Sequence, residues 1–319
     1  RDNAFSAFVT VQPGCDYRCT FCIVPMTRGP ERSRKLADVV GEVTRLAQAG
    51  TTEVTLLGQT VNSYHDGTHD FGALLRAVGA IAGIRRVRFT SPYPTDFTPA
   101  VLAAMAETPA VCEYVHLPVQ SGSSRTLKRM LRRYDRARYL DVVRALRAAI
   151  PGIALSTDII VGFPGETEEE FQETLSLVEQ VEFDDAYTFK YSVRDGTPAV
   201  RIKDHVPEDV KTERIGRLIA AVRRLAKRKN MGLVGSTHEV LVERPAKRGG
   251  GALLQARTRT NKIALLEGPT EWIGTYRQVR FTGTTGSTFT AWPIAHETLT
   301  TVPPLRIVER GSGGEVPWP

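Results

Sequence analysis

The stretch GCDYRCTFCIVPMTRG, residues 14–29, holds three of the four cysteines of this 319-residue chain, at positions 15, 19 and 22. Their spacing is C-x3-C-x2-C, and they directly follow AFVTVQ (residues 7–12), a short apolar run that is typical of a strand. Four cysteines in the whole chain are too few for a disulfide framework. The clustering of three in one loop therefore predicts a metal or iron–sulfur site.

The number of cysteines bears on which metal the loop suits. Structural zinc needs four protein ligands, and the other candidates, Cys112, His65 and His69, are remote in sequence. Catalytic zinc uses three ligands, but three thiolates from one short loop are unusual for it. A four-iron cluster takes one ligand per iron. Three cysteines would leave one iron open to an outside ligand, which predicts a [4Fe-4S] cluster that also binds a cofactor.

Strands and helices alternate from residue 5 to residue 231, which indicates parallel strands joined by crossover helices. Six such units are fewer than the eight of a closed barrel, so a partial barrel or an open doubly wound sheet fits. In both folds ligands bind at the carboxyl ends of the strands. The predicted strands are 7–12, 53–57, 87–90, 114–117, 153–161 and 186–191, and the predicted helices are 35–49, 71–81, 99–106, 124–131, 136–149, 167–181 and 207–230.

From about residue 233 the pattern changes to short alternating segments separated by Gly, Asn and Pro. This pattern predicts a small all-β barrel. We therefore expect an α/β core over residues 1–232, a barrel over residues 233–300, and a loose tail rich in Pro and Gly over residues 301–319.

The composition, with 41% hydrophobic and 24% charged residues, is that of a soluble globular protein. No apolar run of about 20 residues is present, so we expect no membrane span, and the N-terminus does not resemble a signal peptide. The few cysteines fit a reducing compartment, and we expect a cytoplasmic monomer. A net charge of +7 is weak evidence for an acidic partner such as nucleic acid.

The C-x3-C-x2-C loop after the first strand of a partial barrel resembles the signature of radical S-adenosylmethionine (SAM) enzymes. The resemblance implies a partial (β/α)6 radical SAM barrel in which Cys15, Cys19 and Cys22 are the catalytic cluster ligands. In that family the methionine part of SAM chelates the open iron. One electron from the cluster then splits the sulfonium and releases a 5′-deoxyadenosyl radical.

Further motifs resemble one branch of that superfamily, the methylthiotransferases: TLLGQTVNSY (55–64), HLPVQSGS (116–123) and STDIIVGFPGETEEEF (156–171). The first is similar to the tRNA branch, the MiaB type. This implies a sulfur-group transferase that adds a methylthio group to C2 of N6-isopentenyladenosine next to the anticodon. The implied partners are the tRNA anticodon stem-loop and an electron donor such as flavodoxin or ferredoxin.

Polar and glycine residues at the predicted strand ends are expected to bind the cofactor. Gly162 and Gly165 let backbone approach a ligand closely, and Asp158 is a charge inside an apolar strand, which needs a partner. For each, a plain turn or a satisfied polar group is the alternative. The expected cofactor-binding residues are Gln59, Thr60, Asn62, Gln120, Ser121, Asp158, Gly162, Gly165 and Arg28.

The C-terminal segment resembles the TRAM module, a small RNA-binding β-barrel. Its basic side chains suit phosphate contacts, although a solvated basic face is the alternative. The expected RNA-binding residues are Arg244, Lys247, Arg248, Arg257, Arg259 and Lys262.

Full-length methylthiotransferases carry an N-terminal domain with three more cysteines that hold an auxiliary [4Fe-4S] cluster. Only Cys112 stands outside the loop here and the chain does not begin with Met, so we expect a piece of a longer protein that cannot thiolate alone. The alternatives are a methylthiotransferase for N6-threonylcarbamoyladenosine or a ribosomal protein, and a non-catalytic RNA-binding protein with a structural metal.

Overall fold

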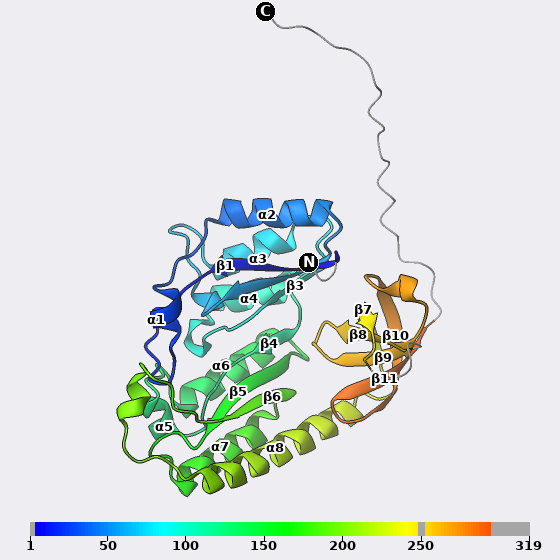
Figure 1. Ribbon diagram of the computed structural model, residues 1–319. Coiled ribbons are helices and arrows are strands. Elements are labelled where there is room, and N and C mark those ends of the chain that lie inside the picture. The colour runs from blue at the N-terminus through cyan, green and yellow to red at the C-terminus, as the bar shows by residue number, and fades with distance from the viewer. Residues whose placement is uncertain (1–3, 248–252, 295–319) are drawn as a thin grey trace, which may run out of the picture.

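The computed structural model describes residues 4–247 and 253–294 (Figure 1). The predicted tail over residues 301–319 lies outside this part of the chain. None of the helices in the described residues is both long and apolar enough to cross a bilayer.

Six parallel strands form the core, in two three-stranded sheets with the orders β1-β2-β3 and β4-β5-β6. A single parallel bridge between Val87 and Val111 joins the two sheets. Within the described residues, β1 and β6 are the free edges. The prediction of a partial barrel is confirmed. The strands are β1 (Ser6–Gln12), β2 (Glu53–Gly58), β3 (Arg86–Phe89), β4 (Tyr114–His116), β5 (Ala154–Val161) and β6 (Asp185–Lys190).

Helices connect these strands and cover the outer face of the sheets (Figure 1). The helices are α1 (Val24–Arg28), α2 (Leu36–Gln48), α3 (Phe71–Gly79), α4 (Pro99–Glu107), α5 (Ser124–Arg129), α6 (Arg136–Ala149), α7 (Glu168–Val181) and α8 (Glu208–Met231), with 3-10 turns at Val61–Ser63, Pro94–Asp96, Pro198–Arg201 and Thr270–Trp272. Only α1, inside the cysteine loop, was not predicted.

Local sequence explains where these helices begin. Asp70, Thr98 and Asp135 cap α3, α4 and α6 by accepting a hydrogen bond from a backbone N–H of the first turn. At α7, Thr167 and Glu170 form a reciprocal capping box. The apolar faces of these helices pack on the sheets in one continuous core.

The C-terminal part is a closed five-stranded barrel with the strand order β10-β11-β9-β8-β7. It has a separate core that includes Val240, Leu254, Phe281 and Phe289. The expected all-β barrel is therefore confirmed, while the domain boundary near residue 232 stays a prediction. The strands are β7 (Thr237–Pro245), β8 (Leu253–Thr258), β9 (Ile263–Glu267), β10 (Tyr276–Thr284) and β11 (Thr288–Pro293).

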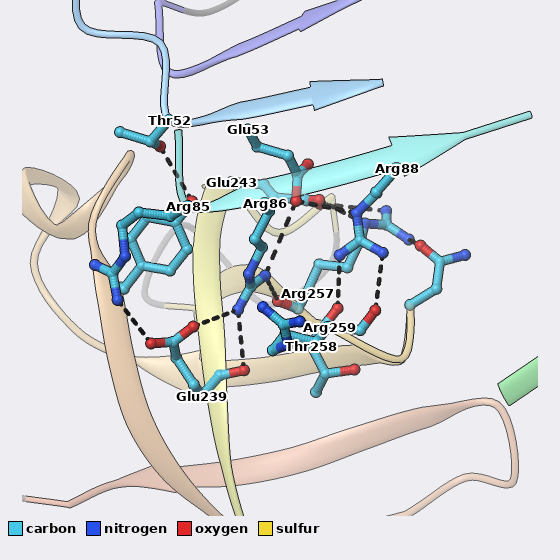
Figure 2. Close-up of polar contacts among 12 residues, drawn as sticks. Thr52, Glu53, Arg85, Arg86, Arg88, Glu239, Glu243, Arg257, Thr258 and Arg259 are labelled. Carbon is cyan, nitrogen blue, oxygen red and sulfur yellow. Dashed lines mark hydrogen bonds and ion pairs between the residues drawn. The ribbon is translucent and has the colours of Figure 1, made fainter. Parts of the chain in front are cut away.

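This barrel contacts the amino ends of the core strands, at the end opposite the cysteine loop (Figure 1). Figure 2 shows Arg86 and Arg88, both from β3, pointing at the hairpin that joins β8 to β9. Arg86 is fully buried, and its Nη1 donates to the Arg257 carbonyl at 2.8 Å. Arg88 donates to the carbonyls of Thr258 and Arg259 at 2.8 and 2.9 Å.

Carboxylates complete this junction. Glu53 at the start of β2 accepts from Arg88 Nε at 3.0 Å, and Glu239 of β7 accepts from Arg86 Nη2 at 3.0 Å. The two guanidinium groups thus bond hairpin carbonyls, the buried Glu53 carboxylate and the partly exposed Glu239 carboxylate at once, which is the arrangement in which a buried charge is tolerated. The C-terminal barrel is therefore held to the core by directional bonds.

Replacing Arg86 by Met should destabilise the chain by about 3 kcal/mol, because the Glu239 carboxylate and the carbonyls of Arg257 and Glu239 lose a buried donor. The matched control is Arg85→Met. Arg85 is half-exposed, pairs with Glu239 and lies 3.7 Å from the Tyr276 ring, so its loss should cost less than about 1 kcal/mol. Denaturant unfolding measures both, and equal losses would refute the role of the buried contacts.

Candidate active site at the cysteine loop

The cysteine loop leaves the carboxyl end of β1 and returns beside it. The backbone N–H groups of Cys15, Arg32 and Arg34 donate to the carbonyls of Gly29, Pro13 and Val11 at 2.9 to 3.1 Å. Gly14 adopts φ 81°, and a Cβ there would lie 2.0 Å from the Pro30 carbonyl oxygen. The loop therefore crosses itself so tightly that only glycine fits at position 14.

The three loop cysteines are free thiols that lie close enough to influence one another. Cys15 and Cys19 are buried and Cys22 is half-buried. Burial raises the pKa of the Cys15 and Cys22 thiols, and the neighbouring loop cysteines raise it further. Three thiolates here need compensating positive charge, which a bound metal cluster supplies. Within residues 4–247 and 253–294, no His, Cys, Asp or Glu side chains group to hold a single metal ion.

An arginine and a stack of aromatic rings support this loop. Arg132 Nη1 donates to Cys19 Sγ at 3.3 Å, and its guanidinium lies 4.5 Å from the centre of the Tyr93 ring. Tyr93 stacks on Tyr17 with ring centroids 3.8 Å apart. The Tyr17 hydroxyl donates to Asp96 at 2.8 Å, and burial followed by the Asp96 charge raises the Tyr17 pKa. None of these side chains was predicted.

The predicted residues after β2 lie against the end of the cysteine loop. Thr60 Oγ1 donates to Glu31 Oε2 at 2.7 Å, so its hydroxyl already has a partner. Asn62 is buried, with both ends of its amide bonded to the backbone of Tyr93. Gln59 is half-buried. This geometry assigns Thr60 and Asn62 to loop positioning, and their contact with a cofactor stays a prediction.

The loop after β5 also reaches the cysteine loop, because the Phe21 and Phe163 rings meet edge-on at 6.5 Å. Gly162 adopts φ 69°, and its N–H donates to Glu166 Oε1 at 2.8 Å. Gly165 adopts φ 75° and lies beside the Arg129 side chain. Both glycines thus build a tight turn that is packed against Lys211 and Arg129, and their contact with a cofactor stays a prediction.

The remaining predicted cofactor residues differ in their surroundings. Gln120 is buried with φ 71°, while Ser121 is fully buried and hydrogen-bonded to Thr174. Asp158 lies 3.2 Å from His116 Nε2, so the partner that its charge needs is a histidine of β4. Arg28 is exposed at the end of α1. Whether these four bind a cofactor stays a prediction.

Three of the predicted RNA contacts are engaged elsewhere in the protein. Arg259 pairs with Glu113 of the core at 2.7 Å, Lys262 pairs with Asp184 at 2.6 Å, and Arg257 pairs with Glu243. Arg244 and Lys247 are exposed, and Arg248 lies outside the described residues. The ion pairs leave Arg259 and Lys262 at the junction between barrel and core, and their contact with RNA stays a prediction.

Gly14→Ala should destabilise the chain by about 3 kcal/mol, because strain at positive φ adds to the collision with Pro30. Gly29→Ala is the matched control: Gly29 has φ 73° but nothing within 4 Å of the added Cβ, so only backbone strain acts and we expect a smaller loss of about 2 kcal/mol. Unfolding curves and the rate of thiol labelling in the native state measure both. Identical behaviour of the two variants would contradict the tight crossing.

Three relatives are similar over most of the chain, and each is named tRNA-2-methylthio-N(6)-dimethylallyladenosine synthase. The protein from Clostridium botulinum is 49% identical over 283 residues and 88% of this chain. Those from Sorangium cellulosum and Thermus thermophilus are 51% and 53% identical over 83% of this chain. The chain spans 63%, 58% and 57% of these three proteins, about three fifths of their length.

Solved structures agree on the fold of the core. Coproporphyrinogen III oxidase from Escherichia coli, described as a radical SAM enzyme, superposes with a TM-score of 0.53 at 17% identity, over 86% of this chain and 66% of that one. The radical SAM methyltransferase TsrM from Kitasatospora setae gives 0.52 at 21% identity, over 60% and 38%. The family described as the radical SAM superfamily matches residues 9–178. With the cysteine loop at the carboxyl end of β1 in a partial barrel, the chain belongs to the radical SAM superfamily.

Proposed function

We propose that this chain is the radical SAM and RNA-binding portion of a tRNA methylthiotransferase acting at C2 of N6-isopentenyladenosine beside the anticodon. The observation that carries the proposal is the identity of about half the residues, over more than four fifths of the chain, with proteins named for that modification. The threonylcarbamoyl base and a ribosomal protein remain the alternative substrates.

The donor set fits a [4Fe-4S] cluster held by Cys15, Cys19 and Cys22. All three thiols are free and sit in one loop, and a cationic centre would supply the positive charge that three neighbouring thiolates need. The Arg132 hydrogen bond to Cys19 Sγ is the kind of contact that tunes such a centre. When bound, the cluster supplies the electron that splits SAM into a radical able to attack a C–H bond.

The chain's own residues position the reactants around this loop. The turn that contains Gly162 and Gly165 lies beside it through the Phe21–Phe163 contact, and we assign the adenosine part of SAM to that side. No side-chain hydrogen bond joins Gln59 or Gln120 to another described residue, so their amides are the best remaining candidates for polar contacts with SAM.

Several parts of this proposal concern the whole protein. An auxiliary [4Fe-4S] cluster belongs to the full-length enzyme, in which it serves sulfur transfer. The anticodon stem-loop is the substrate, flavodoxin or ferredoxin is the electron donor, and the protein acts as a cytoplasmic monomer. The basic composition, with a net charge of +7, supports an RNA partner.

The first test is reductive cleavage of SAM. The chain is reconstituted anaerobically with iron and sulfide, reduced with dithionite, and assayed for 5′-deoxyadenosine. We expect product from the wild type and from Cys112→Ala, which removes a buried core thiol, and none from Cys19→Ala. An intact four-iron cluster without product in the wild type would refute radical chemistry by this chain.

The second test identifies the base that supplies the hydrogen. Anticodon stem-loops carrying deuterium at C2 of the modified adenosine are offered to the reduced chain, and deuterium in 5′-deoxyadenosine is read by mass spectrometry. We expect transfer from the isopentenyl-modified loop at least about tenfold faster than from the threonylcarbamoyl-modified loop, since a misplaced base loses reactivity steeply. The reverse preference would reassign the substrate.

A further inference from the structure

A groove separates the second half of α8 from the C-terminal barrel, with a cavity of about 600 Å³. Arg223 and Lys227 of α8 line one side, and Tyr187 of β6 lies along the floor. The turns that follow β8 and β10 form the other side, including Asn261 and Gly286. We call this cavity the α8 groove. It is bounded by both parts of the molecule, so a ligand in it contacts core and barrel together.

The groove is positively charged. Arg223, Lys227, Arg257 and Lys262 line it, against Asp184 and Asp185. Lys262 is neutralised by Asp184 and Arg257 by Glu243, which lies outside the groove. Arg223 and Lys227 are exposed and have no carboxylate within ion-pair distance in the part of the chain that the structure describes. Two uncompensated cations, one helical turn apart, therefore face the groove.

The other cations of the same helix segment are paired. Arg224 pairs with Glu179 and Arg228 with Glu182, both on the side of α8 that faces α7. The sequence shows an unbroken basic run here, but the fold divides it into two faces. Only the face on the groove keeps positive charge available for an outside anion.

The groove continues into the inner face of the core. A second cavity of about 410 Å³ shares Tyr114, Tyr187, Arg257 and Asn261 with it, and is also lined by Phe8 of β1. This second cavity thus reaches from β6 to β1, the two free edges of the parallel strands. Tyr187 is 54% exposed and Phe8 is 72% exposed, so flat aromatic faces are open to solvent along this path.

We propose that the α8 groove binds an RNA strand, with phosphates on Arg223 and Lys227 and unpaired bases stacked on Tyr187 and Phe8. Uncompensated cations beside exposed aromatic rings are the combination by which proteins hold unpaired nucleotides. This inference rests on the proposed function and adds to it where the RNA lies, because the groove leads from the C-terminal barrel to the open side of the core.

The test measures binding of a fluorescein-labelled anticodon stem-loop RNA to the 319-residue chain by anisotropy, over a range of KCl concentrations. Arg223→Ala combined with Lys227→Ala should weaken binding about tenfold or more at low salt. The slope of log Kd against log[KCl] should fall by about 1.4, the value for two phosphate contacts on a single strand.

The matched control is Arg224→Ala combined with Arg228→Ala, which removes the same two charges at the same spacing from the other face of α8. Binding should stay within about twofold of wild type. Tyr187→Ala should weaken binding about tenfold, and Tyr187→Phe should retain it, because stacking needs only the ring. Thermal unfolding checks that every variant is folded.

The outcomes separate the two proposals. Loss in the Arg223/Lys227 double variant and in Tyr187→Ala, but not in the Arg224/Arg228 control, supports the groove. Equal loss in both double variants shows that net charge alone acts and overturns the groove. RNA binding by wild type with no loss in any variant overturns the groove while leaving the proposed function standing. A chain that makes 5′-deoxyadenosine but does not bind the RNA overturns both.

Discussion

The architecture of this chain depends on two arginines of one short strand. Arg86 and Arg88 leave β3 at the amino ends of the core strands and donate to three successive carbonyls of the β8–β9 hairpin. Removing such donors from water is costly unless they find hydrogen-bond partners, so the hairpin must lie where the guanidinium groups require it. Together with Glu53 and Glu239, this contact decides where the C-terminal barrel sits and therefore which end of the core remains open.

The open end carries the cysteine loop. Contacts of residues other than the cysteines hold this loop in its conformation. Gly14 lets the loop cross itself, Arg132 reaches Cys19, and the Tyr17–Tyr93 stack joins the loop to the segment after β3. Buried thiols with raised pKa values are poor thiolates on their own. A cationic centre that binds here must therefore displace the thiol protons as it binds.

Sequence patterns predicted the elements well where local signals are strong. The run IALSTDIIV (153–161) is apolar enough to be a buried strand, and the acids in the first turn of α7 match a helix N-terminus. The helix α1 was missed because five residues within a loop carry no measurable periodicity. The cysteine site and the superfamily could also be predicted from the sequence, because both are indicated by the spacing of three cysteines.

Side-chain partners were harder to predict, because they depend on long-range contacts. Arg259 and Lys262 form a local basic cluster, which favoured an RNA-binding role. Their carboxylate partners, Glu113 and Asp184, stand 146 and 78 residues earlier in the chain. Asp158 likewise required a partner, and the fold supplies His116 from the neighbouring strand. A cluster of basic residues in the sequence therefore does not show which of them can bind an anion, because the fold can pair some of them with carboxylates from distant segments.

The C-terminal barrel lies at one end of the core strands and the cysteine loop at the other. The length of the core strands therefore fixes the distance between them. The longest core strand, β5, has eight residues and spans about 26 Å. A substrate that engages both ends must itself be at least that long and rigid, and its second contact is then made at a high effective concentration. Under the proposed function, the scaffold selects its substrate by length: a free nucleoside cannot reach both ends of the core strands, so it lacks the second contact that a structured RNA would make.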